Sequence, residues 1–154
     1  MAHKKNLDLS VYLVTDRDLS LGRSLDWVVE KAVQGGTTMV QLREKDLDTR
    51  PFIEEALRIK KLLEPYDVPL LINDRVDVAL AVGADGVHLG QNDMPYAAAR
   101  RILGKEAIIG LSVETWQQAE EAKDLDVDYI AVSPVYTTPT KEELTRELGL
   151  EGVR

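Results

Sequence analysis

The chain has 154 residues, a length that fits one domain, and 44% of them are hydrophobic, enough for a buried core. Its net charge of −8 argues against nonspecific binding to nucleic acid or an anionic membrane, although a local group of basic side chains can still bind an anion. It has no cysteine, so it has neither disulfides nor a thiolate metal site. We see no signal-peptide core and no apolar run of membrane-span length, and we expect a cytoplasmic protein.

Apolar strands and amphipathic helices alternate along the chain. The expected strands are Val11–Asp16, Thr38–Glu44, Pro69–Asp74, Gly86–Gly90, Ala107–Val113 and Tyr129–Tyr136. The expected helices are Leu25–Val33, Pro51–Leu63, Val76–Val82, Pro95–Leu103 and Thr115–Lys123. The strands are continuous apolar runs, which is typical of parallel strands buried on both faces.

Two architectures fit this alternation: an open doubly wound sheet and a (β/α) barrel. The first turn from strand to helix reads "TDRDLSLGRS" and lacks the G-x-G-x-x-G pattern of dinucleotide-binding sheets. The sequence therefore favours an α/β protein of the barrel type.

The second strand has an apolar face and a polar face. If it continues as a strand, Gln41, Arg43 and Lys45 share one side, and Val40 and Leu42 share the other. Polar residues also end the other strands, where sites lie in parallel α/β proteins; they are Thr15, Asp16, Asn73, Asp74, Arg75, Gln91, Asp93, Ser112, Thr137, Thr138, Thr140 and Lys141. Any single one can be a residue that simply meets solvent, but the whole set points to a site.

The side chains of this set suit a polyphosphate ligand. Arg43 can fork onto phosphate oxygens, and Lys45 adds a point charge. Asp74 and Asp93 follow adjacent strands and suit Mg²⁺, which takes a few protein oxygens and completes its shell with water and phosphate. Without a ligand the charges can instead pair with one another, for instance Arg43 with Asp74.

Three further features have competing interpretations. The segment "TTPTK" at 137–141 is a candidate anion cradle or an ordinary polar loop. His88 lies mid-strand in "GVHLG", and we expect a packed or outward-facing side chain rather than a catalytic one. Trp27 and Met39 are expected in the core.

Five segments resemble thiamine phosphate synthase in order and spacing: "YLVTDRDL", "QLREKD", "NDRVDVALAVGADGVHLGQNDMP", "IIGLSV" and "SPVYTTPTKEE". The resemblance runs from Val11 to about Arg154. It implies a TIM (β/α)₈ barrel and the Mg²⁺-dependent joining of hydroxymethylpyrimidine diphosphate to thiazole phosphate, which yields thiamine phosphate and pyrophosphate.

The resemblance also implies roles for individual residues. Asp74 and Asp93 correspond to the Mg²⁺ ligands, and Gln41, Arg43, Lys45, Asn73, Ser112 and Lys141 correspond to pyrimidine-diphosphate contacts. Thr138 and Thr140 correspond to the loop that holds the thiazole phosphate. Arg43, Lys45 and Lys141 would stabilise charge on the departing pyrophosphate.

The chain shows six strands where the resemblance implies eight. We expect a single domain over residues 1–154 that is a barrel truncated to about six units, either a fragment or a chain completed by a homo-oligomer or a complementing chain. Its partners are expected to be small-molecule substrates.

Other functions stay open. One is a thiazole tautomerase, whose relatives typically lack both acids that stand here at Asp74 and Asp93. A second is a non-catalytic truncated barrel that binds thiamine precursors. A third is a sugar-phosphate barrel enzyme, which usually places its phosphate site after strands seven and eight.

Overall fold

The structure, a computed structural model, describes residues 7–136 and 147–153. Its strands are β1 (Tyr12–Val14), β2 (Met39–Leu42), β3 (Leu70–Asn73), β4 (Gly86–Leu89), β5 (Ile108–Val113) and β6 (Tyr129–Val132). They form one parallel sheet in chain order. The helices are α1 (Leu25–Gln34), α2 (Thr49–Leu63), α3 (Val76–Val82), α4 (Tyr96–Leu103) and α5 (Trp116–Lys123), with a 3-10 turn η1 (Glu64–Tyr66). The predicted alternation of parallel strands and helices is confirmed.

Local sequence signals set the helix ends. The Ser24 hydroxyl caps α1 by accepting a hydrogen bond from the Trp27 backbone N–H at 3.3 Å. Thr115 caps α5 in the same way, as the sequence predicted. The apolar stripe predicted for α2 is buried in full and comprises Phe52, Ala56, Ile59 and Leu63.

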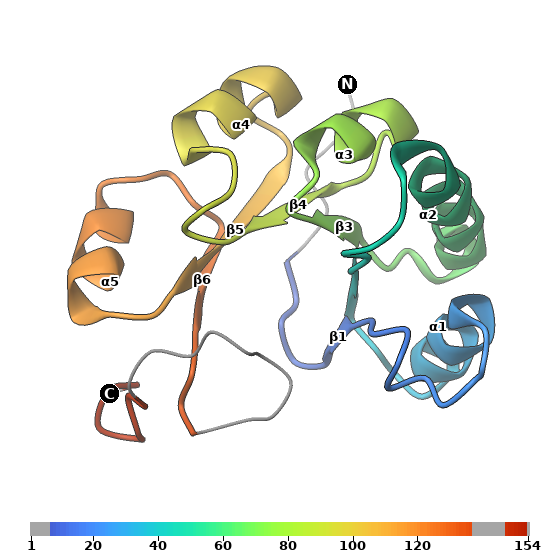
Figure 1. Ribbon diagram of the computed structural model, residues 1–154, viewed down its shortest axis with the longest axis horizontal. Coiled ribbons are helices and arrows are strands. Elements are labelled where there is room, and N and C mark those ends of the chain that lie inside the picture. Colours follow the sequence, from blue (N-terminus) through green and yellow to red (C-terminus); the bar gives the residue numbers. More distant parts are fainter. Residues whose placement is uncertain (1–6, 137–146, 154) are drawn as a thin grey trace.

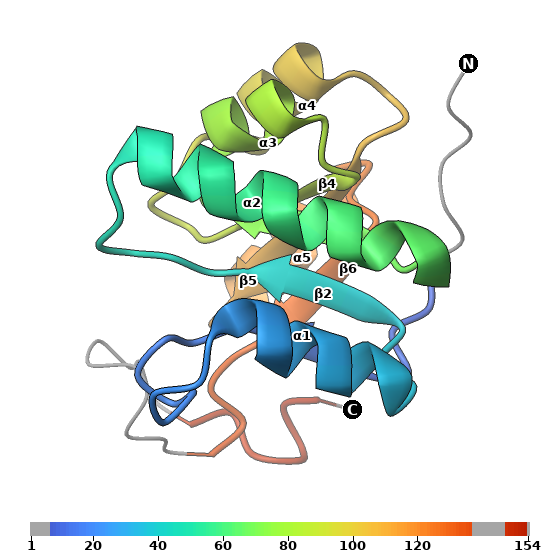
Figure 2. The ribbon, with the colours of Figure 1, turned by 90° about the vertical axis from the view of Figure 1, so that its right-hand side faces the viewer.

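The main core lies between the sheet and its helices. In Figure 2, α1 and α2 lie alongside β2, whose outward residues Val40 and Leu42 are fully buried in this core. Burying side chains of this size stabilises the fold by roughly 1.5–3 kcal/mol each. The predicted apolar back of the second strand is therefore confirmed.

The opposite face of the sheet is concave and has its own smaller core. Met39, Leu71, Ile108 and Tyr129 form its buried cluster, and Tyr12 packs against it. The hydroxyl oxygens of Tyr12 on β1 and Tyr129 on β6 lie 2.6 Å apart. In a flat sheet these two edge strands would stand about 24 Å apart, at about 4.8 Å per strand. The sheet is therefore strongly curled, and Figure 1 shows its strands as a curved row with the helices outside it.

Three expectations need correction. The second strand ends at Leu42 rather than Glu44, because the Arg43 backbone N–H donates to the Thr15 hydroxyl at 2.9 Å instead of continuing the ladder. The sixth strand ends at Val132 rather than Tyr136, since Pro134 has no N–H to donate to a ladder. Trp27 is 47% exposed, with the Arg23 guanidinium 5.4 Å from its ring centre, whereas Met39 is buried as expected.

Within residues 7–136 and 147–153, no helix has the length and apolar character that crossing a membrane requires.

Candidate functional site

Two carboxylates meet where β3 and β4 end. Asp74 directly follows β3 and takes a left-handed backbone conformation with φ of 62°, which aspartate tolerates better than most residues. Its N–H donates to the His88 carbonyl oxygen at 2.9 Å. Asp93 lies in the turn after β4, where one of its oxygens accepts the Gly90 N–H at 2.7 Å. The backbone thus fixes both carboxylates at one edge of the sheet, as the sequence predicted.

The closeness of these acids has an electrostatic cost. The pKa of Asp74 is raised to about 6, first by burial and then by its hydrogen bond and charge repulsion with Asp93. The charge of Lys45 and a hydrogen bond from Asn73 act in the opposite direction. A proton or a cation between the two carboxylates would relieve this repulsion, so the structure brings together Asp74, Asp93, Lys45 and Asn73.

Arg43 pairs with Asp16 and not with Asp74, the partner that the sequence suggested for the protein without a ligand. Its guanidinium lies 3.3 Å from an Asp16 carboxylate oxygen, and both side chains are about one quarter exposed. Arg43 and Lys45 line a cavity of about 140 Å³ together with Asp16, Arg17, Asp18, Glu44, Asp46 and Leu47. Arg43 thus pairs with Asp16 rather than with Asp74, in a partly exposed ion pair that contributes little stability and can open for another anion.

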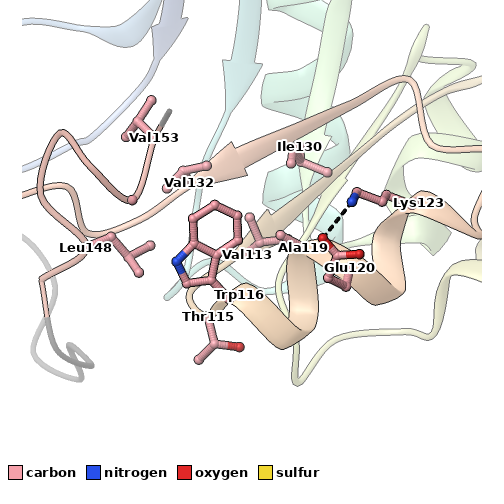
Figure 3. Close-up of a pocket in the computed structure, with 11 residues that line it drawn as sticks. Val113, Thr115, Trp116, Ala119, Glu120, Lys123, Ile130, Val132, Leu148 and Val153 are labelled. Atoms are coloured by element: carbon pink, nitrogen blue, oxygen red, sulfur yellow. Dashed lines mark hydrogen bonds and ion pairs between the residues drawn. The ribbon is translucent and has the colours of Figure 1, made fainter.

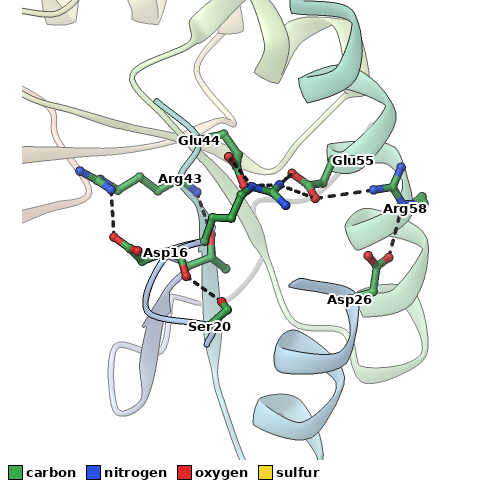
Figure 4. Close-up of polar contacts among 9 residues, drawn as sticks. Asp16, Ser20, Asp26, Arg43, Glu44, Glu55 and Arg58 are labelled. Carbon is green, nitrogen blue, oxygen red and sulfur yellow. Dashed lines mark hydrogen bonds and ion pairs between the residues drawn. The ribbon is translucent and has the colours of Figure 1, made fainter. Parts of the chain in front are cut away.

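Glu44 lies between the two basic residues in sequence but points the other way. Figure 4 shows Arg43 directed toward Asp16, and Glu44 directed toward α2. Arg17 lies 2.7 Å from Glu44 and 2.8 Å from Glu55, and both carboxylates are almost fully buried. This cluster anchors the segment after β2, and no sequence spacing predicted it.

Gln41 lies below the strand ends, inside the curled sheet. It is 3% exposed, and its amide nitrogen donates to the Tyr12 hydroxyl at 2.6 Å. The sequence reasoning placed Gln41 on the same polar surface as Arg43 and Lys45. The structure buries Gln41 deeper than these two residues, with its amide paired to the Tyr12 hydroxyl of the concave core.

Ser112 and His88 share this concave surface. The Ser112 hydroxyl lies 2.9 Å from one ring nitrogen of His88, and the other ring nitrogen lies 2.9 Å from the Tyr129 hydroxyl. His88 is therefore packed, as expected, and faces the concave side rather than outward. Sequence reasoning missed Tyr12 and Tyr129, because they lie on β1 and β6 and chain order does not show that the side chains of these two strands meet.

The predicted residues Thr138, Thr140 and Lys141 lie outside the described residues.

A second cavity lies on the helix side of the sheet. It has a volume of about 220 Å³ and lies among α5, β5, β6 and the segment 148–153. Figure 3 shows Trp116, Ile130 and Val153 around it, with Lys123 paired to Glu120. It contains none of the predicted site residues, so the candidate site is the one at the strand ends.

Known proteins resemble the chain over most of its length. The family model described as thiamine monophosphate synthase matches residues 11–154. A thiamine-phosphate synthase of Albidiferax ferrireducens is 55% identical over all of this chain and 71% of its own length. One from Leptospira biflexa is 57% identical over 94% of this chain and 70% of its own length.

A solved structure agrees with these matches. Thiamine phosphate pyrophosphorylase from Pyrococcus furiosus superposes with a TM-score of 0.83 at 39% identity, over 94% of this chain and 67% of that protein. The chain thus spans about 70% of the length of the relatives it matches. With a family match over residues 11–154 and a superposable structure, the chain belongs to the thiamine monophosphate synthase family.

Proposed function

We propose that the chain catalyses thiamine phosphate synthesis, in which hydroxymethylpyrimidine diphosphate and thiazole phosphate give thiamine phosphate and pyrophosphate. The observation that carries this proposal is the Asp74–Asp93 pair, held beside Lys45 at the edge of the sheet. Relatives of the chain are named for this activity. Two acids with basic groups beside them suit a metal-bound diphosphate better than an uncharged ligand.

The proposed cofactor is Mg²⁺, held by Asp74 and Asp93. The two carboxylates offer oxygen ligands, and no cluster of three or more His, Cys, Asp or Glu side chains that could hold a metal occurs within residues 7–136 and 147–153. Two carboxylates whose repulsion raises the pKa of Asp74 fit an ion that takes few protein ligands and completes its shell with water and phosphate. When bound, Mg²⁺ supplies positive charge beside the diphosphate.

The reaction replaces a C–O bond by a C–N bond at the pyrimidine methylene carbon. The C–O bond breaks, and its electron pair leaves with pyrophosphate, whose charge Arg43 and Lys45 stabilise. The thiazole nitrogen then attacks the methylene carbon. Arg43 can reach the diphosphate by leaving its weak pairing with Asp16. Ser112 and Asn73 would position the pyrimidine substrate, and Thr138, Thr140 and Lys141 stay predicted contacts.

We also propose that the six strands and their helices form part of a single TIM (β/α)₈ barrel domain. The strands run parallel in chain order, the helices lie outside, and Tyr12 and Tyr129 touch across the concave face. This degree of curling supports a closed barrel over an open twisted sheet.

The experiment measures pyrophosphate release and thiamine phosphate formation from both substrates with Mg²⁺. We expect Mg²⁺-dependent formation of both products and a loss of at least about a hundredfold in Asp93→Asn, the range expected when a transition-state charge loses its support. Asp77→Asn is the matched control, since Asp77 pairs with Arg75 on the surface. A folded chain that forms no thiamine phosphate would contradict the proposal, and pyrimidine-diphosphate binding without turnover would favour a non-catalytic binding protein.

A further inference from the structure

Five side chains form a continuous hydrogen-bonded row across the concave face. It runs from Gln41 to Tyr12 at 2.6 Å, to Tyr129 at 2.6 Å, to His88 at 2.9 Å and to Ser112 at 2.9 Å. The row links β2, β1, β6, β4 and β5. Its two ends, Gln41 and Ser112, are both predicted substrate contacts, whereas the three residues between them have no assigned role.

The packing holds this row in a single arrangement. Tyr129 crosses the backbone of Gly110, where an added Cβ would lie only 2.0 Å from the ring. Its ring then stacks on His88 with centroids 5.6 Å apart and meets Tyr12 edge-on at 5.8 Å. Buried, close-packed rings of this kind do not change rotamer freely, so the hydrogen bonds have fixed partners.

Proton counting gives the row a direction. The Gln41 amide nitrogen can only donate, so the Tyr12 oxygen accepts. Burial raises the pKa of both tyrosines, so each keeps its one proton at neutral pH. If Tyr129 donated to Tyr12, the Tyr12 proton would have no acceptor among the described residues, at a cost of about 1–3 kcal/mol. The satisfied arrangement has Tyr12 donating to Tyr129.

The same counting fixes the far end. Tyr129 then donates to Nδ1 of His88, which leaves the neutral imidazole proton on Nε2. Nε2–H donates to the Ser112 oxygen. Within residues 7–136 and 147–153, no other group takes the Ser112 proton, so the hydroxyl is left as a donor at the end of β5.

We propose that His88 and Tyr129 are positioning residues that make the Ser112 hydroxyl a hydrogen-bond donor to a phosphate oxygen of the bound substrate. The proposal rests on the proposed function for the identity of the ligand. The row explains why a buried histidine lies between a tyrosine and a serine, both of its ring nitrogens being used. It also joins the two ends of the pyrimidine site through groups that need not touch the substrate.

The first test is the tautomer of His88 in the free protein, read from the ¹⁵N shifts of its ring nitrogens by NMR. The chain has only two histidines, so assignment is direct. We expect the proton on Nε2, and in Tyr129→Phe a shift toward the Nδ1–H form because the phenol no longer donates to Nδ1. Tyr66→Phe, a change at a partly exposed tyrosine, should leave the tautomer unchanged. A proton on Nδ1 in the unmodified chain would overturn the proposal.

The second test is binding of inorganic pyrophosphate in the presence of Mg²⁺, followed by calorimetry. Ser112→Ala should weaken binding about tenfold, because it loses one hydrogen bond to a charged group. Tyr129→Phe should weaken binding severalfold. The control Tyr66→Phe should leave the affinity within twofold of the unmodified chain. His88→Gln, which can keep a donor toward Ser112, should bind better than the shorter His88→Asn. Unchanged affinity in folded Tyr129→Phe would contradict the positioning role.

The two proposals fail in different ways. An Nε2–H tautomer with weakened pyrophosphate binding in Tyr129→Phe, but no thiamine phosphate from the intact chain, would support the row and contradict the proposed reaction. Product formation with the opposite tautomer would support the reaction and overturn the row.

Discussion

At the residue scale, Asp74 has the most distinctive environment in the candidate site. It combines a left-handed backbone, partial burial and a neighbouring acid. Burial and the neighbouring acid both disfavour a bare carboxylate, and a bound cation would offset these two effects. Strain and unfavourable charge of this kind persist where the surrounding structure imposes them, which is typical of functional sites.

Asp93→Asn should lower the pKa of Asp74 from about 6 toward its ordinary value, because the repelling charge is removed while burial remains. The folded chain binds this proton more tightly than the unfolded chain, so stability falls as pH rises from about 3.8 to about 6. This fall should be smaller in Asp93→Asn. A carbon NMR titration of the Asp74 carboxyl without metal measures the pKa. Urea unfolding at about pH 3.8 and about pH 6 measures the fall in stability. An unchanged pKa would mean that the two acids do not interact.

Gly110→Ala should destabilise the fold by about 1–3 kcal/mol, the usual cost of overpacking a core. The added methyl group would meet the Tyr129 ring at 2.0 Å and push it off His88. Gly35→Ala is the control, since its Cβ would approach the carbonyl oxygens of Ala32 and Lys31 no closer than 3.3 Å. Urea unfolding measures both variants, and equal effects would mean that Tyr129 is not confined by Gly110.

At the element scale, the segment after β2 carries its basic residues without being part of a strand. The ladder stops at Leu42, yet Arg43 and Glu44 still point to opposite sides. Two contacts hold this geometry: the Thr15 hydroxyl on the Arg43 N–H, and Arg17 on Glu44. The alternation that the sequence suggested thus persists through tertiary contacts rather than strand pairing.

Arg17→Met should lower the free energy of unfolding by about 1–2 kcal/mol, because it leaves the buried Glu44 and Glu55 carboxylates without their shared cation. The effect is no larger because the Arg17 side chain is 52% exposed and its charge is partly screened by solvent. It should also weaken Mg²⁺-pyrophosphate binding by loosening Arg43 and Lys45. Arg58→Met is the matched control, because its contacts with Asp26 and Glu55 are longer, at 3.5 and 3.6 Å. Equal affinity for pyrophosphate in both variants would exclude a link between this cluster and the basic residues.

At the scale of the whole molecule, curling gathers groups that are distant in the chain. Tyr12 and Tyr129 are 117 positions apart, yet their hydroxyls touch. The same curvature points the ends of six strands toward one region and makes a shared site out of residues from each. A ligand that binds there should therefore stabilise the whole sheet.

Mg²⁺ and pyrophosphate together should raise the melting temperature more than the sum of their separate effects, because each completes the other's site. At a hundredfold excess over the dissociation constant, the expected stabilisation is about 2.7 kcal/mol. Asp93→Asn should remove the joint effect, whereas Asp77→Asn should retain it. Differential scanning calorimetry measures this, and purely additive shifts would argue against a common metal and diphosphate site.

The sequence by itself determined the elements and the carboxylate pair. Helical spacing, caps and apolar runs are local signals, so the bounds of α3 and the cap of α5 could be predicted from neighbouring residues. Asp74 and Asp93 could be paired because parallel strands end at one edge, which follows from chain order alone. The strand ends were less predictable. The ladder of β2 stops because the Thr15 hydroxyl, which follows β1, accepts the Arg43 N–H in place of a backbone carbonyl.

Only the tertiary structure decided which polar groups meet. The burial of Gln41, the row from Tyr12 to Ser112 and the ion pairs of Arg17 join residues from different strands and helices. Such contacts depend on how far the sheet curls and on where a glycine such as Gly110 admits a large ring. Periodicity places a side chain on a face but cannot say which side chain it touches there, because that depends on the position of every neighbouring strand.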